Sequence, residues 1–240
     1  MTDVPSRAKP EPRLYVIGDI HGCTDLLDRM IGLIQRDIDQ YPGAECLTVT
    51  VGDYVDRGPD SRGVIDRLAR NPFPTDYIAL KGNHEDFLLK FMRDPLIGPI
   101  WRRNGGLETL QSYGVPIEDL RRDQGYFEAA SALAAAMPEA HKKFLGSLKL
   151  AVSLGPYFMC HAGVRPGVPL DQQKADDLMW IREEFLLSPM DFGQIIVHGH
   201  TPVEAPECLP NRINVDTAAV LTGRLTCVAL DGKRPRFLST

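Results

Sequence analysis

The chain has 240 residues, of which 43% are hydrophobic and 25% are charged, and its formal net charge is −5 at pH 7. This length and apolar content suffice for one well-buried α/β domain. The acidic balance provides no basic surface for nucleic-acid binding and no polybasic membrane signal. No run reaches the ~18 apolar residues that a membrane-spanning helix requires. We therefore expect neither nucleic acid nor a membrane as a partner.

The first twelve residues, MTDVPSRAKPEP, are rich in proline and charge and have no apolar core. This composition predicts a disordered leader over residues 1–12 rather than a signal peptide or an anchor. A single domain is expected over residues 13–240. The five cysteines form no CxxC pair, and their odd number argues against a disulfide framework. We therefore expect a cytoplasmic location.

The first ninety residues alternate between strand and helix patterns. Short β-branched or buried-strand runs occupy residues 13–19, 46–53 and 76–83, and helical spacing of apolar residues occupies 23–41 and 61–70. This β-α-β-α-β order predicts a parallel sheet, because each crossover helix returns the chain to the same end of the sheet. In such sheets, ligand sites lie at the carboxyl ends of the strands.

Residues 85–148 are mostly helical in pattern, which predicts a helical elaboration beside the sheet rather than an independent domain. Within it, His141 in EAHKK is expected on a helix surface. The last ninety residues return to short strands, interrupted by a helical pattern over 172–187. These strands predict a second sheet, mixed or antiparallel, that faces the first. The expected fold class is therefore α/β.

Several predicted strands end in a glycine followed by a polar side chain. A glycine permits a sharp turn and a close approach of the backbone to a ligand. The pairs are Gly18-Asp19, Gly52-Asp53, Gly82-Asn83 and Gly199-His200, and His21 and His161 lie in similar segments. Together these side chains supply three oxygen and three nitrogen donors, too many for one tetrahedral zinc and suited to two metal ions with open positions.

Each of these motifs alone has a simpler explanation. A Gly-Asp pair at a strand end is commonly a turn, and a lone histidine is more often a hydrogen-bonded core residue than a ligand. Six donors in series favour a metal centre, because turn chemistry requires no histidine. One carboxylate must bridge two ions. Asp53 is the natural candidate because it lies at the end of the central strand among the first three. Two bridged ions can hold a hydroxide and stabilise a phosphoryl displacement.

Five segments in this order, GDIHG, GDYVDRG, GNHE, HAGV and GHTP, resemble the metallophosphoesterase superfamily. More narrowly, they resemble its phosphoprotein-phosphatase branch, in the compact form of bacterial and phage serine/threonine protein phosphatases, which is related to the symmetrical diadenosine tetraphosphatases. The resemblance spans Gly18 to Pro202, about three quarters of the chain. It implies a β-sandwich of two mixed sheets flanked by helices and a metal-bridging hydroxide as the nucleophile.

The resemblance also assigns the metal ligands. Asp19, His21 and Asp53 would hold the first ion, with Asp53 bridging, and the second would be completed by Asn83, His161 and His200. Manganese, iron and zinc are common in the family. A donor set of an amide, two carboxylates and three imidazoles is borderline-hard, which favours manganese in vitro.

Arginine binds phosphate well because its planar fork donates two parallel hydrogen bonds. Arg57 and Arg182 are therefore candidate phosphate ligands, together with Asn83 and Lys81. The alternatives are a surface turn for Arg57 and an ion pair with Glu183 or Glu184 for Arg182. Two divalent ions and these arginines would make the site locally positive in an acidic protein.

A leaving alkoxide needs a proton, and His84 is the candidate general acid. Successive side chains at an extended strand end point to opposite sides, so Asn83 can face a metal while His84 faces the leaving oxygen. Asp56 is expected to accept a hydrogen bond from the far ring nitrogen of His84, as in the family. Glu85 and Asp86 suit the first turn of the following helix and are expected to be structural.

Two substrates fit these motifs. The first is phosphoserine or phosphothreonine in a protein, and the second is diadenosine tetraphosphate or a similar nucleotide. A small phosphate ester is an expected substrate under both hypotheses. Asp56 favours the first, because the symmetrical tetraphosphatases generally lack an aspartate there. Lys81 is a departure, since relatives that act on proteins usually carry arginine before GNH. A catalytically dead binding module is a remote third hypothesis, because all the expected ligands are present.

Two neighbouring features have open explanations. His198 is expected in the core or behind the ligands rather than as a seventh ligand. The segment Asn104-Gly105-Gly106, with Trp101 nearby, resembles one in the bacterial relatives, and it would either line the pocket or form a helix-entry turn.

Overall fold

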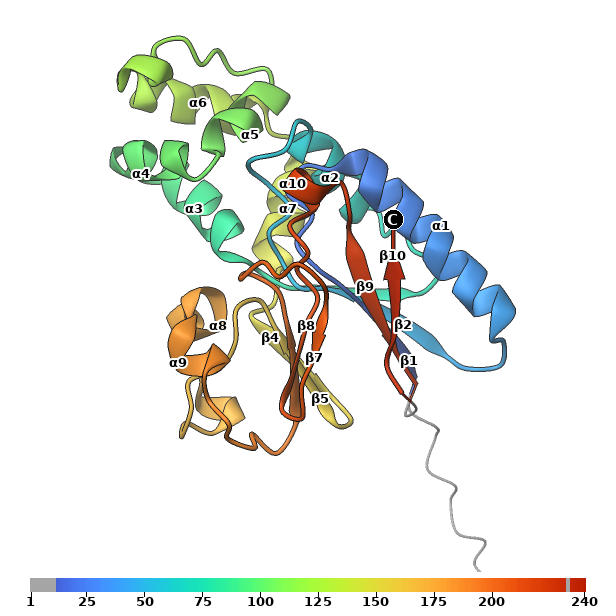
Figure 1. Cartoon of the computed structure of the whole chain (residues 1–240). Helices are drawn as coiled ribbons and strands as arrows, with labels where there is room; N and C mark the ends of the chain where they lie inside the picture. The colour runs from blue at the N-terminus through green and yellow to red at the C-terminus, as the bar shows by residue number, and fades with distance from the viewer. Residues whose placement is uncertain (1–11, 232–233) are drawn as a thin grey trace, which may run out of the picture.

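The computed structural model describes residues 12–231 and 234–240, so almost all of the expected leader lies outside the described residues. The described chain forms two five-stranded sheets flanked by helices (Figure 1). This arrangement confirms the expected α/β fold of two mixed sheets. No helix within the described ranges is long and apolar enough to cross a membrane.

The first sheet contains both parallel and antiparallel strands. Its spatial order is β10 (Arg236–Ser239), β9 (Thr226–Leu230), β1 (Arg13–Ile17), β2 (Cys46–Thr50) and β3 (Asp76–Ala79). The strands β1, β2 and β3 are parallel, as expected from the β-α-β-α-β pattern. The strand β9 runs antiparallel to both of its neighbours.

The second sheet is also mixed. Its order is β4 (Ala151–Leu154), β5 (Tyr157–Cys160), β6 (Ile195–His198), β8 (Arg212–Asn214) and β7 (Glu207–Cys208). The central strands β5, β6 and β8 are parallel, and the edge strands β4 and β7 are antiparallel to their neighbours. The last two strands of the chain, β9 and β10, do not join this sheet but return to the first. Strand patterns identify buried strands, but they do not identify the partner of each strand.

Helices cover the outer face of the first sheet and extend beyond its end. They are α1 (Thr24–Gln40), α2 (Ser61–Leu68), α3 (Asn83–Phe91), α4 (Gly98–Arg103), α5 (Gly106–Ser112), α6 (Tyr126–Ala136) and α7 (Glu139–Ser147). The helices α3 to α7 form the expected elaboration, and α8 (Ala175–Trp180) and α9 (Glu183–Leu186) lie beside the second sheet (Figure 1). A short helix, α10 (Ala219–Thr222), precedes β9.

The strand β1 illustrates how the core is divided. Its residues alternate between faces, as the two-residue period of a strand requires. Tyr15 and Ile17 belong to the apolar cluster beneath the helices, whereas Leu14 and Val16 belong to the cluster between the two sheets. The first sheet is therefore buried on both faces, which explains the nearly continuous apolar character of this strand.

The expectation that His141 lies on a helix surface is wrong. Its side chain is 1% exposed, and its Nδ1 lies 2.9 Å from the Tyr113 hydroxyl. The physical reason is the helical period, because His141 shares the buried face of α7 with Phe144 and Leu145, three and four residues later.

Candidate active site

The six expected metal ligands converge where strands of the two sheets end. Asp19, Asp53 and Asn83 follow β1, β2 and β3, while His161 and His200 follow β5 and β6. All six side chains, including His21, belong to residues at most 6% exposed. Parallel strands end at the same edge of a sheet, and the two sheets bring their edges together here.

Asp53 lies between two groups of ligand atoms. Its Oδ2 is 3.5 Å from Nε2 of His21, and its Oδ1 is 3.4 Å from Nε2 of His161. Among the described histidine, cysteine, aspartate and glutamate side chains, two groups have ligand atoms close enough to hold an ion: His21, Asp53 and His84, and Asp53, His161 and His200. His84, the expected acid, thus belongs to the first group, whereas Asp19 lies outside both. A carboxylate that presents one oxygen to each group has the geometry expected of a bridging ligand.

The group around His161 suits a cation. Nε2 of His161 is 2.9 Å from Oδ1 of Asn83 and 3.2 Å from Nδ1 of His200. Nδ1 of His161 can donate to the Val51 carbonyl, 3.1 Å away, which leaves the lone pair on Nε2. Three converging acceptor atoms repel one another unless a cation or a proton lies between them. This donor set therefore fits a divalent metal ion.

Burial keeps the imidazoles in the neutral form that binds metals. Desolvation lowers the pKa of His21 to about 3 and that of His200 to about 2. His21 also has a fixed tautomer, because its Nδ1 lies 2.8 Å from the Val55 carbonyl and leaves Nε2 facing Asp53. Both rings can thus present a lone pair at neutral pH.

The carboxylate of Asp19 lies beside an acidic residue that the sequence motifs did not single out, Asp216. Asp19 accepts a hydrogen bond from the backbone N–H of His200, 3.1 Å away. Its pKa is raised well above the usual range by burial and by the charges of Asp216 and Asp53. Asp216 follows β8, so the strand-end pattern that identified Asp19 could also have identified Asp216, although no glycine precedes it. A cation at the site would relieve the mutual repulsion of these buried carboxylates.

Arg57 lies inside the site. Its Nη1 is 2.9 Å from Nε2 of His21, and its Nη2 is 2.9 Å from Nε2 of His84. A guanidinium only donates, so both Nε2 atoms accept in this arrangement. The guanidinium of Arg57 therefore lies between His21 and His84, beside the expected ligand atoms.

His84 and Asp56 form a buried pair. Nδ1 of His84 lies 2.7 Å from Oδ2 of Asp56, and the two residues are fully buried. Burial alone would lower the pKa of His84, but the negative charges of Asp53 and Asp56 outweigh burial and raise it. A raised pKa favours the protonated ring that a general acid requires.

The side chains of Asn83 and His84 point in different directions, as expected, but the physical reason differs from the expected one. These residues are not at an extended strand end but are the first two residues of α3. Successive residues of an α-helix differ by about 100° around the axis. Asn83 therefore faces His161 and His200, while His84 faces Asp56.

Glu85 is structural, and it does more than begin a helix. Its carboxylate accepts hydrogen bonds from the backbone N–H groups of Asp53 (2.9 Å), Tyr54 (2.7 Å) and Gly82 (2.9 Å). It thereby ties the loop after β2 to the start of α3. Gly82 is required at this junction, because a Cβ there would lie 2.1 Å from Oδ1 of Asp53.

The other expected residues lie around this centre. Nζ of Lys81 is 2.6 Å from Oδ1 of Asp86, so its ammonium is already paired. Nη1 of Arg182 lies 3.5 Å from the Thr201 hydroxyl, next to His200. Glu184, one of the two expected partners of Arg182, pairs instead with Arg165. His198 is fully buried and its ring packs against Phe185, outside both ligand groups.

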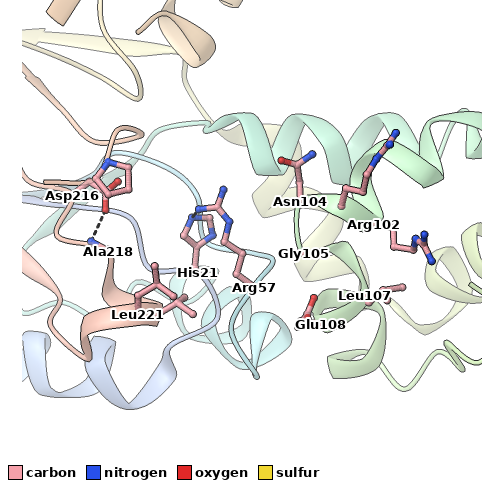
Figure 2. Close-up of a pocket in the computed structure, with 13 residues that line it drawn as sticks. His21, Arg57, Arg102, Asn104, Gly105, Leu107, Glu108, Asp216, Ala218 and Leu221 are labelled. Carbon is pink, nitrogen blue, oxygen red and sulfur yellow. Dashed lines mark hydrogen bonds between the residues drawn. The ribbon is translucent and has the colours of Figure 1, made fainter. Parts of the chain in front are cut away.

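A groove of about 550 Å³ leads away from the centre (Figure 2). His21, Arg57 and Asp216 line its inner end. Asn104 and Glu108 come from the helical elaboration on one side, and Leu221 comes from α10 on the other (Figure 2). The segment Asn104-Gly105-Gly106 therefore does line the pocket, through its first two residues.

A metal-ligand centre of this composition, at the meeting edges of two mixed sheets, is typical of hydrolases that use two metal ions to cleave phosphate esters. The chain belongs to the family of calcineurin-like phosphoesterases, whose family model matches residues 12–223. This finding confirms the resemblance in the sequence motifs.

Individual relatives fall into two groups. The chain is 29% identical to serine/threonine-protein phosphatase 1 of Salmonella typhimurium, over 91% of this chain and 92% of that protein. It is 27% identical to the asymmetrical bis(5'-nucleosyl)-tetraphosphatase PrpE of Anoxybacillus flavithermus, over 89% of this chain and 88% of that protein. The name of this relative specifies the asymmetrical kind, whereas the motif resemblance named the symmetrical kind.

Solved structures agree on the fold. A provisionally assigned diadenosine tetraphosphatase superposes with a TM-score of 0.65 at 22% identity, covering 95% of this chain and 94% of that one. A cold-active protein tyrosine phosphatase superposes with a TM-score of 0.56 at 17% identity, covering 95% and 79%. At these identities the likeness shows the fold alone.

Proposed function

We propose that this protein is a dinuclear-metal-dependent phosphomonoesterase that acts on phosphoserine or phosphothreonine in proteins. The observation that carries the proposal is the buried His84–Asp56 pair, 2.7 Å apart, beside the guanidinium of Arg57. A serine or threonine alkoxide is a poor leaving group and needs a proton, whereas a nucleotide phosphate is a better one. A complete acid pair therefore suits the phosphoprotein substrate.

Six residues would hold the two ions: Asp19, His21 and Asp53 the first, and Asn83, His161 and His200, with Asp53 bridging, the second. When bound, two divalent ions supply an activated water and positive charge for the phosphate oxygens. We propose manganese in vitro, with iron or zinc as alternatives. A cytoplasmic location is part of the proposal, and the absence of disulfides among the five cysteines supports it.

The side chains of this chain divide the remaining work. Arg57 and Arg182 would bind phosphate oxygens, together with the amide of Asn83. The ammonium of Lys81 is paired with Asp86, so the proposal does not include Lys81 among the phosphate ligands. Protonated His84 would repel Arg57 at their present separation of 2.9 Å, and a phosphate dianion between the two groups would relieve that repulsion.

Proton transfer would follow from the same geometry. Asp56 holds one proton on Nδ1 of His84, so in the protonated ring the proton that is given up is the one on Nε2, the atom that accepts from Arg57 in the structure. As the phosphorus–oxygen bond of the substrate breaks, this proton passes to the departing oxygen and the ring becomes neutral. The negative charges of Asp53 and Asp56 raise the pKa of His84, which favours the protonated ring.

Cleavage of a dinucleoside polyphosphate is the second candidate, and the PrpE relatives support it. The groove does not favour either candidate, because its lining includes three arginines, Arg57, Arg102 and Arg103, as well as the carboxylates of Glu108 and Asp216. The arginines would attract a chain of phosphates as well as a phosphorylated peptide. The preference for a phosphoprotein therefore rests on the His84–Asp56 pair, which a nucleotide leaving group needs less.

A turnover panel tests the proposal. The protein is stripped of metal, reloaded with manganese and assayed on p-nitrophenyl phosphate, phosphoserine, phosphothreonine and phosphotyrosine peptides, and diadenosine tetraphosphate. We expect turnover of p-nitrophenyl phosphate, abolished by a chelator, and about a hundredfold preference for phosphoserine or phosphothreonine over the dinucleotide. The reverse preference would support the second candidate. No turnover with manganese, iron, zinc, cobalt or nickel would leave only a binding module.

A further inference from the structure

The carboxylate of Asp56 has two partners besides His84. Its Oδ2, which accepts from His84, also accepts a hydrogen bond from Nε1 of Trp101 at 2.8 Å. Its Oδ1 accepts a hydrogen bond from the hydroxyl of Thr109 at 2.6 Å. Asp56, Trp101 and Thr109 are all at most 1% exposed, so these bonds form where water does not compete.

The segment that contains Trp101 and Thr109, residues 101–109, also contacts Arg57, the residue after Asp56. The backbone N–H of Arg57 donates to the Gly105 carbonyl at 3.1 Å. A Cβ at Gly105 would lie 2.6 Å from the backbone nitrogen of Arg57, so only glycine allows this approach. The segment thus contacts both Asp56 and Arg57, although it is about fifty residues away in the chain.

The backbone of Asp56 needs such support. Its φ is +70° and that of Arg57 is +68°, a region that non-glycine residues rarely adopt. The hydroxyls of Thr109 and Ser61 accept hydrogen bonds from the backbone N–H of Asp56, at 2.8 and 3.0 Å. Strained conformations persist only where the surrounding structure determines them. Thr109 therefore fixes both the backbone and the side chain of Asp56.

We propose that Trp101 and Thr109 are positioning residues for the general acid. They hold the Asp56 carboxylate in the plane of the His84 ring and at hydrogen-bond distance from it. In this position the carboxylate keeps Nδ1 of His84 protonated and directs Nε2 at the leaving oxygen. This inference rests on the proposed phosphatase function. It assigns the helical elaboration a part in the chemistry, in addition to its place in the groove wall.

A purely structural role for Trp101 is the competing explanation. Its ring packs against Phe91, with centroids 4.7 Å apart, and against Gly106. Loss of packing would lower the rate on every substrate alike, or would only lower stability. Loss of positioning would lower the rate where proton donation limits the reaction. The dependence on the leaving group therefore separates the two explanations.

The central test uses Trp101→Phe, which keeps an aromatic ring near Phe91, although a smaller one, and removes the indole N–H that donates to Asp56. We expect kcat on a phosphoserine peptide to fall about tenfold, with KM little changed, while kcat on p-nitrophenyl phosphate changes less than about twofold. Thr109→Val should act in the same direction, and Thr109→Ser should retain wild-type rates. The control is Phe91→Leu, which disturbs the ring of Trp101 without touching Asp56.

A second readout does not need turnover. In the metal-stripped protein, the Nδ1 proton of His84 should give a slowly exchanging low-field proton resonance, identified by its absence in His84→Asn. It should exchange faster in Trp101→Phe and Thr109→Val but not in Phe91→Leu. Equal losses on both substrates, or unchanged exchange in the two test variants, would overturn the inference. Failure of wild-type protein to hydrolyse p-nitrophenyl phosphate would instead overturn the proposed function.

Discussion

Left-handed backbone conformations concentrate at the residues of the site. His21, Asp53, Asp56, Arg57 and His200 have φ values of +43°, +54°, +70°, +68° and +65°. Each such non-glycine residue costs on the order of 1–3 kcal/mol, so the rest of the fold must hold it in place. Hydrogen bonds from their backbone N–H groups to neighbouring segments help to hold these turns, as from Asp53 to Glu85 and from Arg57 to the Gly105 carbonyl.

The division of labour between adjacent residues leads to the first prediction. Replacing His84 by asparagine should leave the metal content unchanged, because the six proposed ligands do not include His84, whose Nδ1 is paired with Asp56. The rate on alkyl phosphates should fall by about 10²–10⁴, the usual range for general-acid catalysis. Aryl phosphates should be affected less, since their leaving groups need less protonation. Metal content by elemental analysis and rates on both substrate types check this prediction, and loss of one metal would contradict it.

At the scale of elements, the residues of the site lie in the short connections between strands and helices. The loop after β2 supplies Asp53, Asp56 and Arg57, and the start of α3 supplies Asn83 and His84. Glu85 joins these two elements through backbone hydrogen bonds rather than through contact with a ligand. Its effect on function should therefore pass through the geometry of that loop.

The second prediction follows from this junction. Glu85→Gln replaces one acceptor oxygen by an amide that faces a backbone N–H, and a buried donor left without an acceptor costs about 1–3 kcal/mol. We expect the free energy of unfolding to fall by this amount and manganese binding to weaken. Glu128→Gln is the matched control, because Glu128 occupies the same third position of α6 but is exposed. Equal unfolding free energies for the two variants in urea would contradict the prediction.

The third prediction concerns how the elaboration docks on α2. His141 of α7 contacts Tyr113 and lies 3.4 Å from Asp66 of α2. Burial lowers its pKa below the ordinary value of 6.5, and the Asp66 charge offsets this only in part. Below pH 6.5, His141 therefore binds a proton more readily in the unfolded chain than in the folded chain, and this lowers the free energy of unfolding. The stability associated with neutral His141 is present above pH 6.5 and is lost as the pH falls.

The measurement is a pair of urea titrations at about pH 7.5 and pH 5.5, on wild type and His141→Gln, each giving a free energy of unfolding. The wild type should lose more stability than the variant on acidification. A larger loss in the variant would show that the sign is wrong.

The sequence motifs predicted the donors at the strand ends because their spacing follows the strands, and β-α-β-α-β order brings those ends together. They missed Asp216, which no glycine marks, and the hydrogen bonds from Trp101 and Thr109 to Asp56. These last contacts depend on how a helical segment folds back over the sheet, and no local pattern encodes such a long-range approach. The start of α3 at Asn83 was likewise hidden, since helix boundaries are the least certain feature of a pattern.

At the scale of the whole molecule, the centre joins the two sheets. One ligand group contains Asn83 from the end of the first sheet and His161 and His200 from the second sheet. Asp53, also from the first sheet, lies next to His161. A metal ion held by both sheets binds the folded chain far better than the unfolded chain. Metal binding should therefore stabilise the packing of the sheets against each other as well as the site itself.

The fourth prediction tests this coupling. Manganese at about a hundred times its dissociation constant should raise the free energy of unfolding of the stripped protein by about 2.7 kcal/mol per ion bound, by mass action. Asp53→Asn should lose most of this gain, because the amide can present an oxygen to only one of the two groups. The control is Asp25→Asn, since Asp25 is exposed on α1 and should leave the gain unchanged. Unfolding in urea with and without manganese gives both quantities. An equal gain in wild type and Asp53→Asn would mean that the ions stabilise the chain elsewhere, and that Asp53 is not the ligand through which the two sheets are joined.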